Sequence, residues 1–112
     1  MAATRSKQIE IHDSAANLFA DLGLADAAEL DIKVRLAVEI VRLINARKLT
    51  QVAAAAVLKI NQPKVSALKH YKLDGFSVER LMSFLLALGQ DVEILIRPRR
   101  GKSEGKISVA AA

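Results

Sequence analysis

The sequence predicts a mainly α-helical domain of about four to five helices, followed by a single β-strand near its C-terminus. Apolar residues recur with a period near 3.6 over residues 31–48, and capping residues open further short helical segments as far as residue 88. After Gly89 the pattern changes to alternation with a period of two. With 112 residues, 52% of them hydrophobic, the chain is long enough to bury one small core but not two.

The composition divides the chain into three parts. Residues 1–16 mix charged and polar residues without a lasting period, which predicts a flexible N-terminal tail. Residues 17–98 carry the periodic patterns and form the expected domain, whereas the basic, glycine-containing residues 99–112 predict a second flexible tail. No apolar run approaches the roughly 18 residues of a membrane span, and residues 1–13 lack the apolar core of a signal peptide. We therefore expect a soluble cytoplasmic protein with no membrane partner.

The residues needed for several kinds of chemistry are missing from the sequence. There is no cysteine, which excludes disulfides and thiolate metal sites, and His12 and His70 are too few to replace them. The sequence has no serine, histidine and aspartate set, no metal-ligand spacing and no phosphate-binding glycine loop. We expect a protein that is not an enzyme and that needs neither a metal nor a cofactor.

The first helical segments are an apolar patch and a long amphipathic helix. The patch is followed by an acidic, helix-like run over residues 26–30, and the two together suggest an anchored arm. The patch consists of Leu18, Phe19, Leu22 and Leu24. From Asp31 onward, apolar residues with helical spacing alternate with charged ones, which predicts a helix with one buried face. That face consists of Ile32, Leu36, Ile40, Leu43 and Ile44.

Capping residues mark the starts of three further helices. The Thr50 hydroxyl can accept a hydrogen bond from an otherwise unpaired amide in the first turn of the helix that it opens. Asn61 can do the same for the next helix, in which Pro63 is tolerated because its missing N–H falls in the first turn. Ser77 opens the last helix, and Gly89 suits its left-handed C-terminal end. The predicted buried face of this helix is Leu81, Phe84, Leu85 and Leu88.

The alternating segment that follows predicts a β-strand. Pro98 ends it, because proline lacks the N–H that a strand ladder needs. A lone strand is not stable, so the segment needs a partner. We expect it to form a homodimer interface, with pairing to residues 8–12 or 106–110 of the same chain as the alternatives. The interface residues are Val92, Ile94 and Ile96.

Two short helices joined by three residues, at 51–58 and 62–69, have the proportions of a helix-turn-helix unit. Such helices cross closely, so the crossing tolerates only small side chains, and residues 53–56 are four consecutive alanines. Val65 and Leu68 are expected to point inward. The opposite side of the second helix, here called the outward arc, then consists of Gln62, Pro63, Ser66, Ala67 and His70, with Lys64 and Lys69 at its edges.

The outward arc is short and polar, which suits the major groove of DNA. Gln62 can bond an adenine edge with two hydrogen bonds, and Lys64 can donate to guanine or to phosphate. Ser66 and His70 suit either a base or a phosphate. The sequence therefore predicts that this arc contacts DNA.

The charge distribution agrees with an acidic partner. The formal net charge is −3 over residues 1–30, +6 over residues 31–76 and +2 over residues 77–112. A positive middle third predicts binding to an acidic molecule, of which nucleic acid is the commonest. The alternative is a surplus of lysine on a solvated surface.

Several stretches together resemble a known family. "LTQ" (49–51) and "INQPKVSAL" (60–68), each opening a helix, are similar to the Cro/repressor-like helix-turn-helix proteins of the XRE type, which have a lambda-repressor-like bundle. With "NLFADLGLADAAEL", "LDGFSVERLMSFLLALGQDVEI" and "RPR", the chain resembles HigA-like antitoxins encoded beside RelE-type toxins, over roughly residues 17–99. The resemblance implies two partners, a double-stranded DNA operator and a RelE/HigB-type ribonuclease toxin. The protein would neutralise the toxin and repress their shared operon.

The resemblance also concerns individual residues. Gln51 is similar in position to a phosphate-binding glutamine of the family, and Thr50 and Lys69 complete the predicted DNA contacts. Lys59 stands where the family usually has glycine, in a left-handed backbone conformation that costs a side chain on the order of 1 kcal/mol.

The toxin implied by the resemblance is expected to bind residues 17–30. This region is acidic, whereas a ribonuclease that engages ribosomal RNA is expected to be basic. Leu18 and Phe19 would be the buried anchors. The charged rim would consist of Asp21, Asp26 and Glu29. In the alternative reading, the apolar residues simply cover the helix that begins at Asp31. Two other functions stay open, a stand-alone phage-type repressor and a helix-turn-helix interaction module that does not bind DNA.

Overall fold

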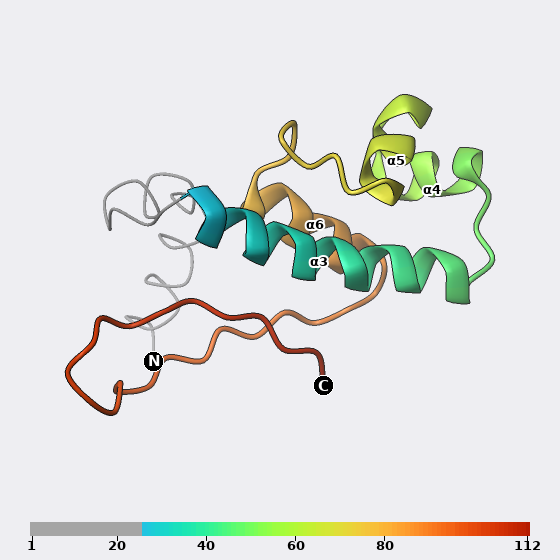
Figure 1. Ribbon diagram of the computed structural model, residues 1–112. Helices are drawn as coiled ribbons and strands as arrows, with labels where there is room; N and C mark the ends of the chain where they lie inside the picture. The colour runs from blue at the N-terminus through green and yellow to red at the C-terminus, as the bar shows by residue number, and fades with distance from the viewer. Residues whose placement is uncertain (1–25) are drawn as a thin grey trace.

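The structure, a computed structural model, describes residues 26–112. Four α-helices lie in this part of the chain: α3 (Asp26–Ala46), α4 (Gln51–Leu58), α5 (Gln62–Lys69) and α6 (Val78–Ala87). Figure 1 shows α3 alongside α6, with α4 and α5 gathered near the C-terminal half of α3. The prediction of a mainly helical fold is confirmed for these residues. None of the described helices is long and apolar enough to cross a membrane.

The core lies between α3 and α6 and is closed by α4 and α5. The five apolar residues predicted on the inner face of α3 are all buried, and so are the four predicted on α6. Leu73 and Phe76, from the connection between α5 and α6, are also buried, and the Phe76 ring packs edge-on against Phe84 with 5.8 Å between centroids. Helices as short as α4 and α5 are not stable alone, so this shared core holds them.

α3 is longer than the sequence predicted. The helix was expected to begin at Asp31, but residues 26–46 form one continuous helix of 21 residues. The extension is favoured because alanine, glutamate and leucine at 27–30 are good helix formers. Ion pairs also join the first turns to the rest, from Lys33 to Glu29 at 3.9 Å and from Arg35 to Asp31 at 3.0 Å. The acidic run over residues 26–30 is therefore part of a packed helix rather than of a separate arm.

The three predicted N-caps are confirmed, and so is the left-handed glycine that follows the last helix. In each N-cap, a backbone amide of the first turn donates to the capping side chain: Ala53 to Thr50 at 3.1 Å, Lys64 to Asn61 at 2.9 Å, and Arg80 to Ser77 at 3.0 Å. Gly89 ends α6 with φ of 77°, and its amide donates to the Leu86 carbonyl. These bonds satisfy amides and carbonyls that the ends of a helix leave unpaired.

The predicted β-strand is not formed. Residues 91–99 follow α6 without regular secondary structure, and they make no backbone hydrogen bond to another described residue. Figure 1 shows this segment leaving α6 and running below α3, while the end of the chain returns in the opposite direction. Val109, in that returning part, packs against the core. An alternating pattern gives a strand its two faces but does not supply the neighbouring strand that completes the ladder. Within the described part of the chain, no such neighbour pairs with it.

Candidate nucleic-acid interface

α4 and α5 form the predicted helix-turn-helix unit. Ala54 is completely buried, Ala53 and Ala55 are half-buried, and Ala56 is exposed. Ala54 belongs to the core and Ala55 packs against it, so two of the four consecutive alanines take part in this packing. The exposed Ala56 contributes its high helix propensity.

The turn between the two helices has the predicted left-handed residue. Lys59 has φ of 58° and ψ of 45°, and the Ile60 amide donates back to the Ala55 carbonyl over 3.1 Å. Asn61 then caps α5, so a hydrogen bond to the backbone fixes each side of the turn. This arrangement sets the direction in which α5 leaves α4.

The outward arc of α5 is exposed as predicted. Val65 and Leu68 are completely buried on the inner side of the helix. On the other side, the exposed residues are Gln62, Pro63, Lys64 and His70, and the half-buried ones are Ser66, Ala67 and Lys69. The structure therefore places the five predicted DNA-contacting residues of α5 and its C-cap outside the buried core, with Val65 and Leu68 on the inner side of the same short helix.

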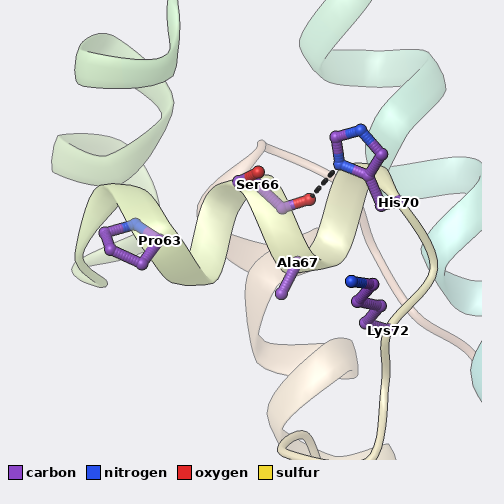
Figure 2. A pocket seen from close by; sticks show the side chains of 5 residues that line it. All are labelled: Pro63, Ser66, Ala67, His70 and Lys72. Atoms are coloured by element: carbon purple, nitrogen blue, oxygen red, sulfur yellow. Dashed lines mark hydrogen bonds between the residues drawn. The ribbon is translucent and has the colours of Figure 1, made fainter.

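An open depression lies on this side of α5 (Figure 2). It is lined by Pro63, Ser66, Ala67, His70 and Lys72. Lys72 belongs to the connection after α5, and Figure 2 shows its side chain turned into the depression. The sequence indicated only a turn at residues 72–75, so this candidate contact was missed. The signal that would have found it is a lysine two residues beyond the helix cap.

His70 closes one end of the depression. Its Nδ1 lies 2.8 Å from the Ser66 carbonyl oxygen, which can only accept, so Nδ1 carries the hydrogen and donates. The same carbonyl also accepts a hydrogen bond from the His70 backbone amide, over 3.0 Å. The bond from the ring ties the imidazole to the end of α5, and it leaves Nε2 to meet a group of a bound molecule.

The stretch of sequence that contains α4 and α5 carries charges of one sign. Residues 40–73 include seven lysine or arginine residues and no aspartate or glutamate. The first turns of α4 and α5 contain no acidic residue either, so the positive ends of both helix dipoles are not neutralised there. Phosphate groups are favoured at such helix starts.

Thr50 and Gln51 lie at the start of α4, outside the depression on α5. Both are exposed, and the Thr50 oxygen already accepts from the Ala53 amide. The Thr50 hydroxyl hydrogen and the Gln51 amide group can still donate, which suits a phosphate oxygen. These two residues therefore form a second group of possible contacts beside the outward arc.

The other predicted site residues are more scattered. Val92, Ile94 and Ile96 lie on the extended segment after α6 and are all exposed, Ile96 by 79%. Asp26 and Glu29 lie in the first turns of α3, where Glu29 pairs with Lys33. Leu18, Phe19 and Asp21 lie outside the described residues. Residues 26–112 bring no group of three histidine, aspartate or glutamate side chains together as a metal site requires.

Comparisons with known proteins agree with this geometry. A family profile described as a helix-turn-helix domain matches residues 18–97. A solved structure provisionally described as an "XRE Family Transcriptional Regulator" is 57% identical in sequence, with a TM-score of 0.74, over 79% of this chain and 100% of that chain. No curated protein matches the chain significantly. Because both matches span most of the sequence, the chain belongs to the XRE family of DNA-binding, helix-turn-helix transcriptional regulators.

Proposed function

We propose that the protein is a sequence-specific repressor that places α5 in the major groove of its operator and also acts as an antitoxin. The observation that carries the DNA-binding part is the polar arc on a capped helix, within a stretch of sequence, residues 40–73, that has seven basic residues and no acidic one. An α-helix fits the major groove, and basic residues around it attract the phosphates on both sides of the groove.

The residues divide between reading bases and binding phosphates. Gln62, Lys64 and Ser66 lie in the first turns of α5, the part of a recognition helix that reaches base edges. Lys69 and His70 lie at its C-terminal end and suit phosphate contacts, as do Thr50 and Gln51 at the start of α4. Lys72 joins the second group because it shares the depression with His70.

The repressor is proposed to be a homodimer. Helix-turn-helix repressors read two half-sites about one helical turn apart, and this spacing requires a two-fold symmetric pair. The segment around Val92, Ile94 and Ile96 supports such an interface, because its apolar side chains are exposed and its backbone has no partner strand among the described residues. Pairing with the same segment of a second copy would satisfy both.

The antitoxin role rests on the resemblance to HigA-like proteins. In this proposal, residues 17–98 form the working domain between a tail at 1–16 and a basic tail at 99–112, and a RelE/HigB-type toxin binds residues 17–30. Asp26 and Glu29 support this placement, since both lie on the first turns of α3 rather than on α4 or α5. A toxin held there would leave the outward arc open to DNA.

DNA binding is tested by titrating the purified chain against a duplex selected from a random pool and against a scrambled duplex, at several salt concentrations. We expect tighter binding to the selected duplex, and we expect the logarithm of the affinity to fall linearly with the logarithm of the salt concentration. Equal affinity for both duplexes would reduce the protein to a non-specific binder. If neither duplex binds, the alternative of an interaction module that does not bind DNA is favoured.

The antitoxin role needs a separate test. Co-expression of the chain with the neighbouring reading frame, followed by purification through a tag on this chain, should yield a complex with a small basic protein. Growth arrest caused by that neighbour alone should be relieved by this chain. If no toxic neighbour exists but the operator binds, the protein is a stand-alone repressor.

A further inference from the structure

The two ring nitrogens of His70 lie in different environments. Nδ1 lies 2.8 Å from the Ser66 carbonyl oxygen, and because this oxygen can only accept, Nδ1 holds the hydrogen. His70 is exposed, and Figure 2 shows its second ring nitrogen, Nε2, on the side of the ring away from this bond. A neutral imidazole has a single N–H, so the neutral ring offers a lone pair at Nε2 and can only accept a hydrogen bond there.

A phosphate contact therefore requires the charged form of this ring. The phosphate oxygens of DNA are acceptors, so they repel the lone pair that the neutral ring presents at Nε2. When the ring gains a proton, both nitrogens become donors. Nδ1 then keeps its bond to Ser66, and Nε2 can donate to a phosphate oxygen in a hydrogen bond that the full positive charge strengthens. The bond that fixes the ring thus makes phosphate binding depend on protonation.

The groups beside His70 suit a phosphate. Lys72 lines the same depression, and no carboxylate is among the residues that line it. Lys69 and Tyr71 are the neighbours of His70 along the chain, and Asp74, the nearest acid in the sequence, is exposed and does not line the depression. A phosphate between Lys72 and His70 would offset the repulsion between two positive charges there. Its arrival favours the protonated ring for that reason.

The helices packed against α5 do not supply an anion in place of the phosphate. α4 contains no titratable side chain over Gln51–Leu58. Glu39 is the only acid in the second half of α3, and its Oε1 accepts from Arg42 over 2.9 Å. Within residues 26–112, neither of these helices therefore holds a free carboxylate that could take the place of the phosphate at His70.

We propose that the depression on α5 binds one DNA phosphate between Lys72 and a protonated His70, so that each chain takes up a proton when it binds DNA. This rests on the proposed DNA-binding function and adds a dependence on pH to it. Histidine is the side chain that ordinarily changes its charge between about pH 5 and pH 8. In the alkaline part of this range the phosphate meets a lone pair, and in the acidic part it meets a charged donor. DNA affinity should therefore rise as the pH falls.

The test is a set of anisotropy titrations at about pH 8 and about pH 5.5 and at constant ionic strength, with the selected and the scrambled duplex. Affinity should rise on the order of tenfold per bound chain, the worth of one hydrogen bond to a charged group. The factor should be the same for both duplexes, because a phosphate contact carries no sequence information. His70→Asn should remove this rise. His12→Asn changes the other histidine of the chain and is the matched control, which should keep the rise.

The failures of the two proposals differ in this experiment. If both duplexes bind but affinity is independent of pH, or rises equally in the parent and in His70→Asn, the proton-linked contact is overturned and DNA binding stands. If acid weakens the selected duplex alone and His70→Asn removes that effect, Nε2 accepts from a base amino group, which also overturns the contact. If neither duplex binds at either pH, the proposed DNA-binding function fails, and this contact fails with it.

NMR of the ring nitrogens tests the same contact without an affinity measurement. In the free protein at about pH 8, the neutral ring of His70 should carry its hydrogen on Nδ1. In the complex with DNA at about pH 7, both ring nitrogens should carry hydrogen. A free ring with its hydrogen on Nε2 would contradict the proposal, because such a ring could donate to a phosphate without gaining a proton. A ring that stays neutral in the complex would contradict it as well.

Discussion

The His70 imidazole donates from Nδ1 to the carbonyl oxygen of Ser66, four residues earlier, over 2.8 Å. This bond fixes the ring at the C-terminal end of the outward arc, where it lines the depression together with Lys72 (Figure 2). Two roles are open to His70, a phosphate contact and the end of the helix. The geometry allows both at once, because one ring nitrogen serves the helix and the other faces outward.

Replacement of His70 by asparagine separates these two roles. The asparagine amide can donate to the Ser66 carbonyl in place of Nδ1 but has nothing in the position of Nε2. We expect an unchanged melting temperature and a loss of DNA affinity of about 1 kcal/mol, the worth of one hydrogen bond. Anisotropy titrations and a thermal melt check both expectations. Unchanged affinity would leave His70 with the helix-ending role alone.

Lys72 is expected to bind phosphate rather than a base. Lys72→Ala should weaken binding to selected and scrambled duplexes by similar factors and reduce the salt slope by about one. Lys102→Ala removes the same charge from an exposed site on the C-terminal segment, which Figure 1 shows far from α4 and α5. The control substitution Lys102→Ala should therefore change the DNA affinity of a single copy only slightly. Equal effects of the two variants would indicate a general charge effect instead of a contact at the depression.

Lys59 carries backbone strain that glycine would relieve. Its φ of 58° lies in the left-handed region, which costs a residue with a Cβ atom roughly 1–2 kcal/mol. Lys59→Gly removes this strain but gives the unfolded chain more freedom, so we expect a net stabilisation of about 0.5–1 kcal/mol. Lys59→Ala loses the same charge but keeps the Cβ atom, and it should not stabilise. Denaturant unfolding of the parent and the two variants measures these differences in stability. If the alanine variant is also stabilised, the effect comes from the lost charge and not from the backbone.

Close packing around α4 depends on one alanine in particular. Ala54→Leu adds three carbons to a position with no exposed surface, and overpacking of this kind costs about 1–3 kcal/mol or more. Ala56→Leu makes the same change at an exposed position of the same helix and should alter stability by less than about 0.5 kcal/mol. Unfolding free energies measure the difference. Similar losses in both variants would mean that helix propensity, not packing, is responsible.

The sequence predicted the helical framework well because local chemistry determines it. Thr50, Asn61 and Ser77 cap the helices that they were expected to open, and Lys59 takes the left-handed conformation that its place in the turn required. Features that depend on contacts with residues far away in the sequence were harder to predict. The strand at residues 92–96 needs a second strand, and the contribution of Lys72 depends on how the connection after α5 folds against the arc.

The candidate site was predictable to the same extent. Helical periodicity assigned Val65 and Leu68 to the core, and this assignment placed Gln62, Lys64 and Ser66 outside. Periodicity could not reveal that α3 extends back to Asp26, because the apolar patch and the acidic run before Asp31 looked like a separate arm.

Whether the outward arc of α5 reads DNA sequence is decided by the ratio of affinities for a selected and a scrambled duplex. Gln62→Ala should lower this ratio on the order of tenfold, because a side chain with two hydrogen bonds to a base discriminates by about 1–3 kcal/mol. Gln51→Ala, at the proposed phosphate contact on α4, should weaken both duplexes together and leave the ratio close to that of the parent. A ratio that Gln62→Ala leaves unchanged, in a protein that still folds, would mean that Gln62 in the outward arc does not read the base sequence.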